Sequence, residues 1–194
     1  MTPPTKDFAA IMLRDAEGLM GNEARREGRE PLYSKNDVTN TLKYIEGIGY
    51  GKKMKATADI SFRLRDAGHI LGSVIVEIFL EGKTIVFSGD LGNPPVPLLR
   101  KTEYIKEADY VVMETTYGDR LHEKREERKS LLEDAIEDTV SNGGTLMIPT
   151  FALERTQELL FELNSLVENN RIPKVPVFMD SPLAINATRI YRKY

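Results

Sequence analysis

Residues 56–80 read Ala-Thr-Ala-Asp-Ile-Ser-Phe-Arg-Leu-Arg-Asp-Ala-Gly-His-Ile-Leu-Gly-Ser-Val-Ile-Val-Glu-Ile-Phe-Leu, and this stretch decides the fold of the middle of the chain. On both sides of its loop at residues 66–73, apolar and more polar residues alternate, which is typical of half-buried β-strands. Glu81-Gly82-Lys83 then indicates a tight turn before a third strand at residues 84–87. The pattern predicts a β-meander whose loops carry the polar residues.

The segments outside the meander predict helices at the start of the chain and alternating strands and helices at its end. Apolar residues three and four apart predict a helix around residues 8–19, and Ser34-Lys-Asn-Asp37 resembles a capping box that opens a second helix. The apolar run at residues 110–113 predicts a strand buried on both faces. The remainder predicts a parallel α/β unit, with strands at residues 145–149 and 175–179 and helices near residues 123–139, 153–167 and from residue 181.

The composition is that of a globular protein and excludes several other classes. The chain has 194 residues, of which 41% are apolar and 29% are charged, and its net charge is −3. No apolar run approaches the roughly 18 residues of a membrane span, and the first residues show no secretory signal. Cysteine is absent, which excludes disulfides and thiolate metal sites. We therefore expect a cytoplasmic protein without a membrane partner.

Two side chains after predicted strands, His69 and Asp90, are candidates for chemistry. Taken alone, His69 could be a loop histidine that bonds a backbone carbonyl, and Asp90 could close its strand as an Asx-turn. The pair is more informative, because the first and third strands of a meander run in the same direction and their following loops open at one edge of the sheet. The two side chains can converge there as metal ligands, and Glu114 ends a later strand and can join them.

Five motifs resemble those of the β-CASP, or RNA-processing, branch of the metallo-β-lactamase superfamily. They stand in the family's order and read Asp66-Ala-Gly-His-Ile-Leu-Gly-Ser73, Phe87-Ser-Gly-Asp-Leu-Gly92, Met113-Glu-Thr-Thr-Tyr-Gly118, Ile148-Pro-Thr-Phe-Ala-Leu-Glu-Arg-Thr-Gln-Glu-Leu159 and Asp180-Ser-Pro-Leu-Ala184. This family includes ribonuclease J and the cleavage and polyadenylation endonuclease. The resemblance implies an α/β fold. A partial metallo-β-lactamase αββα sandwich would span residues 1–118, and part of a parallel β-CASP domain would span residues 119–194.

By this resemblance, the chain is expected to be part of a zinc-dependent ribonuclease that hydrolyses RNA by a two-metal mechanism. The resemblance implies that His69 binds one zinc ion and that Asp90 bridges two. It implies that Glu114 orients a metal-bound group or assists proton transfer. Arg155 and Ser181 would contact the RNA, with surface ion pairing and helix capping as their alternative roles.

The chain also departs from the family pattern in its histidines. The family's His-x-His-x-Asp-His motif and its two later β-CASP histidines are absent, and His122 matches no motif and is expected to face solvent. A catalytic zinc site generally needs three protein ligands, so we expect a truncated fragment with weak zinc binding and little activity alone. An uncovered sheet edge would favour association, including a homo-oligomer. Two alternatives stay open, an inactive RNA-binding or scaffolding paralogue and a small-molecule hydrolase of the same fold.

Overall fold

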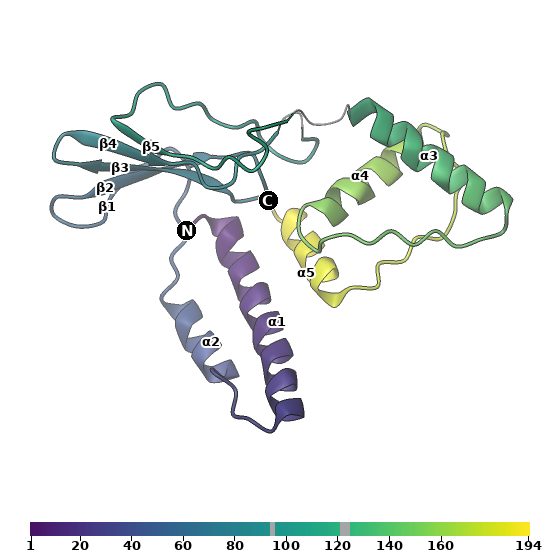
Figure 1. The fold of residues 1–194 in the computed structure, drawn as a ribbon, viewed down its shortest axis with the longest axis horizontal. Helices are drawn as coiled ribbons and strands as arrows, with labels where there is room; N and C mark the ends of the chain where they lie inside the picture. Colours follow the sequence, from purple (N-terminus) through teal and green to yellow (C-terminus); the bar gives the residue numbers. More distant parts are fainter. Residues whose placement is uncertain (94–95, 121–124) are drawn as a thin grey trace.

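The computed structural model describes residues 1–93, 96–120 and 125–194, and the side chains of the last range from residue 129 onward. Within these residues a sheet lies beside two groups of helices (Figure 1). The helices are α1 (Pro3–Glu27), α2 (Lys35–Lys43), α3 (Arg125–Ser141), α4 (Arg155–Glu168) and α5 (Pro182–Tyr191). The strands are β1 (Lys53–Lys55), β2 (Ser61–Asp66), β3 (Val74–Leu80), β4 (Lys83–Phe87) and β5 (Tyr110–Val112).

The direction of the strands determines where the functional loops lie. The sheet has the order β1-β2-β3-β4-β5, with antiparallel pairing from β1 to β4 and parallel pairing between β4 and β5. The predicted meander is therefore confirmed. Since β2, β4 and β5 all run in the same direction, the loops that follow them leave the sheet at one edge. A long connection separates β4 from β5, because parallel neighbours cannot be joined by a tight turn.

A network of ion pairs on one face of the sheet fixes β2 against β3. Arg63 lies opposite Glu77 in the strand register and donates to both of its carboxylate oxygens, at 2.6 and 2.8 Å. Arg65 donates to the same carboxylate at 2.9 Å and to Glu103 at 3.0 Å. Glu103 lies in the connection from β4 to β5, and its N–H donates to the carbonyl of Asp66 at 2.8 Å. The connection therefore contacts the end of β2 on this face of the sheet.

Helices α1, α2 and α5 begin at residues whose side chains cap them. Thr2 caps α1 and Ser181 caps α5, and in each helix a proline follows in the first turn. The capping box predicted for α2 is confirmed, with Ser34 and Asp37 bonded to each other's backbone N–H. None of the described helices is both long and apolar enough to cross a membrane.

The two ends of the chain meet where α1 packs against α5. Phe8 of α1 is buried in a cluster with Ala187 and Ile190 of α5, and its ring lies 5.8 Å from that of Tyr191, measured between centroids. Lys193 adds an ion pair with Asp7 at 2.6 Å. Residues far apart in the sequence thus bring the C-terminal helices close to the start of α1 (Figure 1).

Two of the predicted strands are wrong. Residues 145–149 and 175–179 are not part of a strand, and neither segment pairs with a strand in the part of the chain that the structure describes. Their apolar side chains are open to solvent, as the exposures of Met147 (85%) and Phe178 (88%) illustrate. A strand needs a neighbour that takes up its backbone hydrogen bonds, and the described sheet ends at β5. The helices before, between and after these segments, α3, α4 and α5, form where they were predicted.

Two smaller differences separate the prediction from the structure. The strand Tyr110–Val112 forms, but its side chains are 55% to 60% exposed because it is the last strand of the described sheet. The strand expected from residue 56 starts later, since the N–H of Ala56 donates to the carbonyl of Ile60 in a turn between β1 and β2. His122 lies outside the described residues. The domain boundary after residue 118 stays a prediction.

Replacing Glu77 by Gln should lower the free energy of unfolding by about 2 kcal/mol at neutral pH, because two partly buried arginines lose their counter-charge. Hydrogen bonds from Arg63 hold the pKa of the Glu77 carboxyl below its usual range. The stabilisation is therefore present above the unfolded-state pKa and is lost as the pH falls through the lowered value. Urea titrations between neutral and acid pH should show the difference between the two proteins shrinking in acid.

Lys83→Met serves as the control for this prediction. Lys83 forms an ion pair with Asp109 at 2.8 Å at the solvent-exposed end of β4, where water screens the charges. Its urea midpoint should stay close to that of the unchanged protein. Equal decreases in the free energy of unfolding of the two variants would contradict the stabilising role of the ion-pair network. A decrease in Glu77→Gln that does not depend on pH would contradict it as well.

Candidate active site

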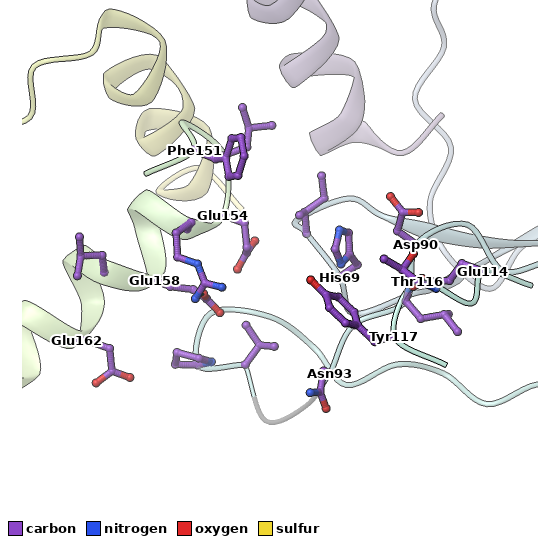
Figure 2. Close-up of a pocket in the computed structure, with 18 of the residues that line it drawn as sticks. His69, Asp90, Asn93, Glu114, Thr116, Tyr117, Phe151, Glu154, Glu158 and Glu162 are labelled. Carbon is purple, nitrogen blue, oxygen red and sulfur yellow. Dashed lines mark hydrogen bonds and ion pairs between the residues drawn. The ribbon is translucent and has the colours of Figure 1, made fainter. Parts of the chain in front are cut away.

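A pocket of about 850 Å³ opens at the edge of the sheet where β2, β4 and β5 end. One wall contains His69, Asp90 and Glu114, each from a loop that follows one of these strands. Figure 2 shows these side chains grouped together, with residues from the start of α4 on the opposite side. The expectation that His69 and Asp90 share one pocket at one sheet edge is therefore confirmed, and their chemical roles stay predictions.

The loop that carries His69 is fixed by hydrogen bonds within the loop and by hydrogen bonds from the start of α1. Within the loop, the hydroxyl of Ser73 accepts the N–H of His69 at 3.1 Å. From outside, the hydroxyls of Thr2 and Thr5 donate to the carbonyl of Gly72 at 2.8 and 2.9 Å. The first turn of α1 therefore anchors the loop and limits the positions that the imidazole can reach.

The loops that carry His69 and Asp90 touch each other directly through their backbones. The N–H of Gly92 donates to the carbonyl of Ala67 at 2.9 Å. A Cβ atom on Gly92 would overlap the backbone carbonyl of Gly68, which cannot move aside as a flexible side chain could. Only glycine permits this approach, and the approach brings the two candidate ligands to the same wall.

Glu114 connects the loop after β5 to the loop after β4. Its carboxylate accepts the N–H of Leu91, the residue after Asp90, at 2.8 Å and that of Thr116 at 3.3 Å. Its own N–H donates to the hydroxyl of Ser88 at 3.0 Å. The hydrogen bond from Leu91 and those from Thr116 lower the pKa of Glu114, so it is a carboxylate at neutral pH. The carboxylate thus orients the backbone beside Asp90.

The opposite wall of the pocket comes from α4 and carries several charges. Arg155 lines the pocket, and an ion pair of 2.9 Å joins it to Glu158. Glu154 accepts a hydrogen bond from Tyr191, and burial raises the pKa of both groups. Sequence reasoning singled out Arg155 but missed the acidic row. The signal was present, because residues four apart on a helix share a face: Glu154, Glu158 and Glu162.

Ser181 does not lie among the residues that line the pocket. Its hydroxyl accepts the N–H of Ala184 at 3.2 Å at the start of α5. This is the capping role that the sequence left open as its alternative to RNA contact.

The donor set is incomplete for a catalytic metal ion. Imidazole and carboxylate ligands suit zinc, manganese or iron, and His69 and Asp90 supply one of each. Across residues 1–93, 96–120 and 125–194, however, no group of three or more His, Asp or Glu side chains is arranged to hold an ion. The described residues therefore do not form a complete metal site, and no chemical step through a metal follows from them.

Comparison with known proteins finds one matching family model and several relatives. The sequence model of the Beta-Casp domain matches residues 156–194, from α4 to the last residue. Ribonuclease TTHA0252 of Thermus thermophilus is 38% identical over 93% of this chain and 39% of its own length. The RNase J-like protein of Methanocaldococcus jannaschii is 34% identical over the whole chain and 44% of its own length. Endoribonuclease YSH1 of Kluyveromyces lactis is 30% identical over the whole chain and 26% of its own length.

Fold, site and relatives together define the class. A sheet whose edge gathers histidine and carboxylates, followed by a β-CASP segment, is a partial metallo-β-lactamase and β-CASP fold, as the sequence predicted. The chain belongs to the β-CASP family of metallo-β-lactamase proteins. It spans less than half the length of each of the three relatives named above.

Replacing Gly92 by Ala should lower the free energy of unfolding by about 2 to 3 kcal/mol, since the added methyl group overpacks a backbone contact. Gly18→Ala in α1 is the matched control, because nothing lies within 4 Å of a Cβ at that position. The control should raise stability by about 0.5 to 1 kcal/mol through helix propensity. Thermal denaturation of both variants measures the difference. Equal changes in thermal stability in the two variants would mean that the loops carrying His69 and Asp90 do not touch.

Proposed function

We propose that this chain forms part of a metal-dependent ribonuclease that hydrolyses phosphodiester bonds in RNA. The observation that supports it is the convergence of His69, Asp90 and Glu114 from the ends of three strands into one pocket beside the β-CASP segment. Three relatives that cover most or all of the chain are named ribonuclease, RNase J-like protein and endoribonuclease. Those names describe the relatives, and the proposal extends their activity to this chain.

Each side chain of the sheet wall has a proposed role that its surroundings support. His69 and Asp90 act as metal ligands, for which an imidazole and a carboxylate on adjoining loops are suited. Glu114 is a positioning residue, because its oxygens accept backbone N–H groups next to Asp90. Zinc is the metal we propose. When bound with its full set of ligands, it would activate water and stabilise charge on the phosphate.

The opposite wall provides a cation for the substrate. Arg155 lines the pocket and is 61% exposed, so its guanidinium is open to a polyanion. We propose that it contacts a phosphate of the RNA and exchanges part of its ion pair with Glu158 for that contact. An RNA chain is long enough to contact both the loops of the sheet and the residues of α4 that line this pocket. Cytoplasmic location and a homo-oligomer stay predictions.

The proposal is tested by expressing the complete open reading frame that contains this chain and measuring cleavage of a 5′-labelled RNA. Loss of a residue that only orients a metal ligand typically lowers activity by roughly 10- to 100-fold. Asp90→Asn should reduce the rate of RNA cleavage by more than this. Glu114→Gln should fall within about 10- to 100-fold. Chelation should remove cleavage, and Zn²⁺ or Mn²⁺ should restore it.

Asp59→Asn is the matched control, because Asp59 is exposed in the turn before β2 and does not line the pocket. It should cleave RNA at the unchanged rate. Cleavage by Asp90→Asn at the control rate would refute the assignment of Asp90. Binding of RNA without any metal-dependent cleavage would instead support the non-catalytic RNA-binding alternative.

A further inference from the structure

The residue just before α4 has a backbone conformation that side chains disfavour. Glu154 has φ 63° and ψ −63°, and its side chain makes no capping hydrogen bond to the helix. Glycine adopts positive φ without cost, whereas any other residue there is strained. Local helix formation therefore does not explain why a glutamate stands at this position.

The carboxylate of Glu154 reaches two distant parts of the molecule. The hydroxyl of Tyr191, in the last turn of α5, donates to Oε2 of Glu154 and accepts the N–H of Leu71 at 3.5 Å. Leu71 lies two residues after His69, and its side chain packs with Tyr191 in the cluster around Phe8. One series of contacts thus joins the start of α4, the end of α5 and the His69 loop.

Gln157 joins α4 to α5 near this contact. It is buried, and its amide nitrogen donates to the hydroxyl of Thr188 in α5 at 2.9 Å and to the carbonyl of Ala152 at 3.1 Å. In the described part of the chain, Oε1 of Glu154 is buried without a hydrogen-bond partner, which lowers stability. Both this oxygen and the strained backbone oppose folding, so the carboxylate is not explained by stability.

We propose that Glu154 is a positioning residue that fixes the spacing of the two pocket walls, by holding α4 to the His69 loop through Tyr191. The value of a fixed spacing rests on the proposed function, because RNA must be held between the candidate ligands on one wall and Arg155 on the other. Figure 2 shows Glu154 at the start of α4, on the wall facing His69. No part of the contact itself requires the ribonuclease assignment.

The test measures the spacing directly and needs no activity. The chain has no cysteine, so Asp59→Cys and Glu168→Cys provide two exposed sites for spin labels, one beside the sheet and one at the end of α4. Pulsed electron paramagnetic resonance should give one narrow distribution of the distance between the two spin labels in the otherwise unchanged protein. It should broaden in Tyr191→Phe, which removes only the hydroxyl, and in Glu154→Gly.

Glu154→Gly separates positioning from stability. Glycine relieves the strain of the positive φ, so the thermal midpoint of this variant should equal or exceed that of the unchanged protein. The distance distribution should nevertheless broaden. The amide hydrogen of Leu71 should exchange about fivefold faster, as the loss of one hydrogen bond implies. Glu154→Gln keeps an acceptor for Tyr191 and should restore the narrow distribution. Tyr194→Phe is the matched control, since its hydroxyl bonds the partly exposed side chain of Asp7, and neither residue lines the pocket.

Each outcome decides the proposal. Narrow distributions in both Tyr191→Phe and Glu154→Gly would overturn it, as would equal broadening in Tyr194→Phe or failure of Glu154→Gln to restore the spacing. If Glu154→Gly does not fold, Tyr191→Phe carries the test, because it keeps the ring that packs against Phe8. Broadening as expected in a protein that never cleaves RNA would uphold the positioning role and refute only the proposed function.

Discussion

The hydrogen bond from the N–H of Gly92 to the carbonyl of Ala67 is the interaction on which the candidate site depends. It requires two loops to meet backbone to backbone, at a distance that excludes any side chain on Gly92. Since His69 and Asp90 stand on these two loops, the contact places an imidazole and a carboxylate on one wall. Their joint position is a property of the backbone rather than of attraction between the side chains.

Strand direction makes this contact possible. Three strands that run in the same direction deliver their following loops to one edge, and the connection between β4 and β5 must cross the sheet to keep β5 parallel. That crossing places Glu103 over Arg65, and so it also completes the ion network around Glu77. The arrangement that holds the sheet together and the arrangement that gathers the site thus share one topological cause.

The two walls of the pocket have different physical characters. The sheet wall is built from loops fixed by several backbone hydrogen bonds, and its ionised Glu114 is well paired. The helix wall carries a strained backbone at Glu154 and buried oxygens without partners among the described residues. Strain of this kind persists where surrounding contacts enforce it, and it concentrates at functional positions.

The sequence by itself determined the meander, the helices, the capping box and the identity of the candidate residues, because these follow from local periodicity and short motifs. It even placed His69 and Asp90 at one edge, since strand direction follows from the order of tight turns. Only the tertiary structure decided that residues 145–149 and 175–179 do not form strands, since they have no neighbouring strand among the described residues, and that β5 is exposed. It alone also joined Glu154 to Tyr191 and Leu71, because packing of α1 against α5 creates that contact and local sequence cannot encode it.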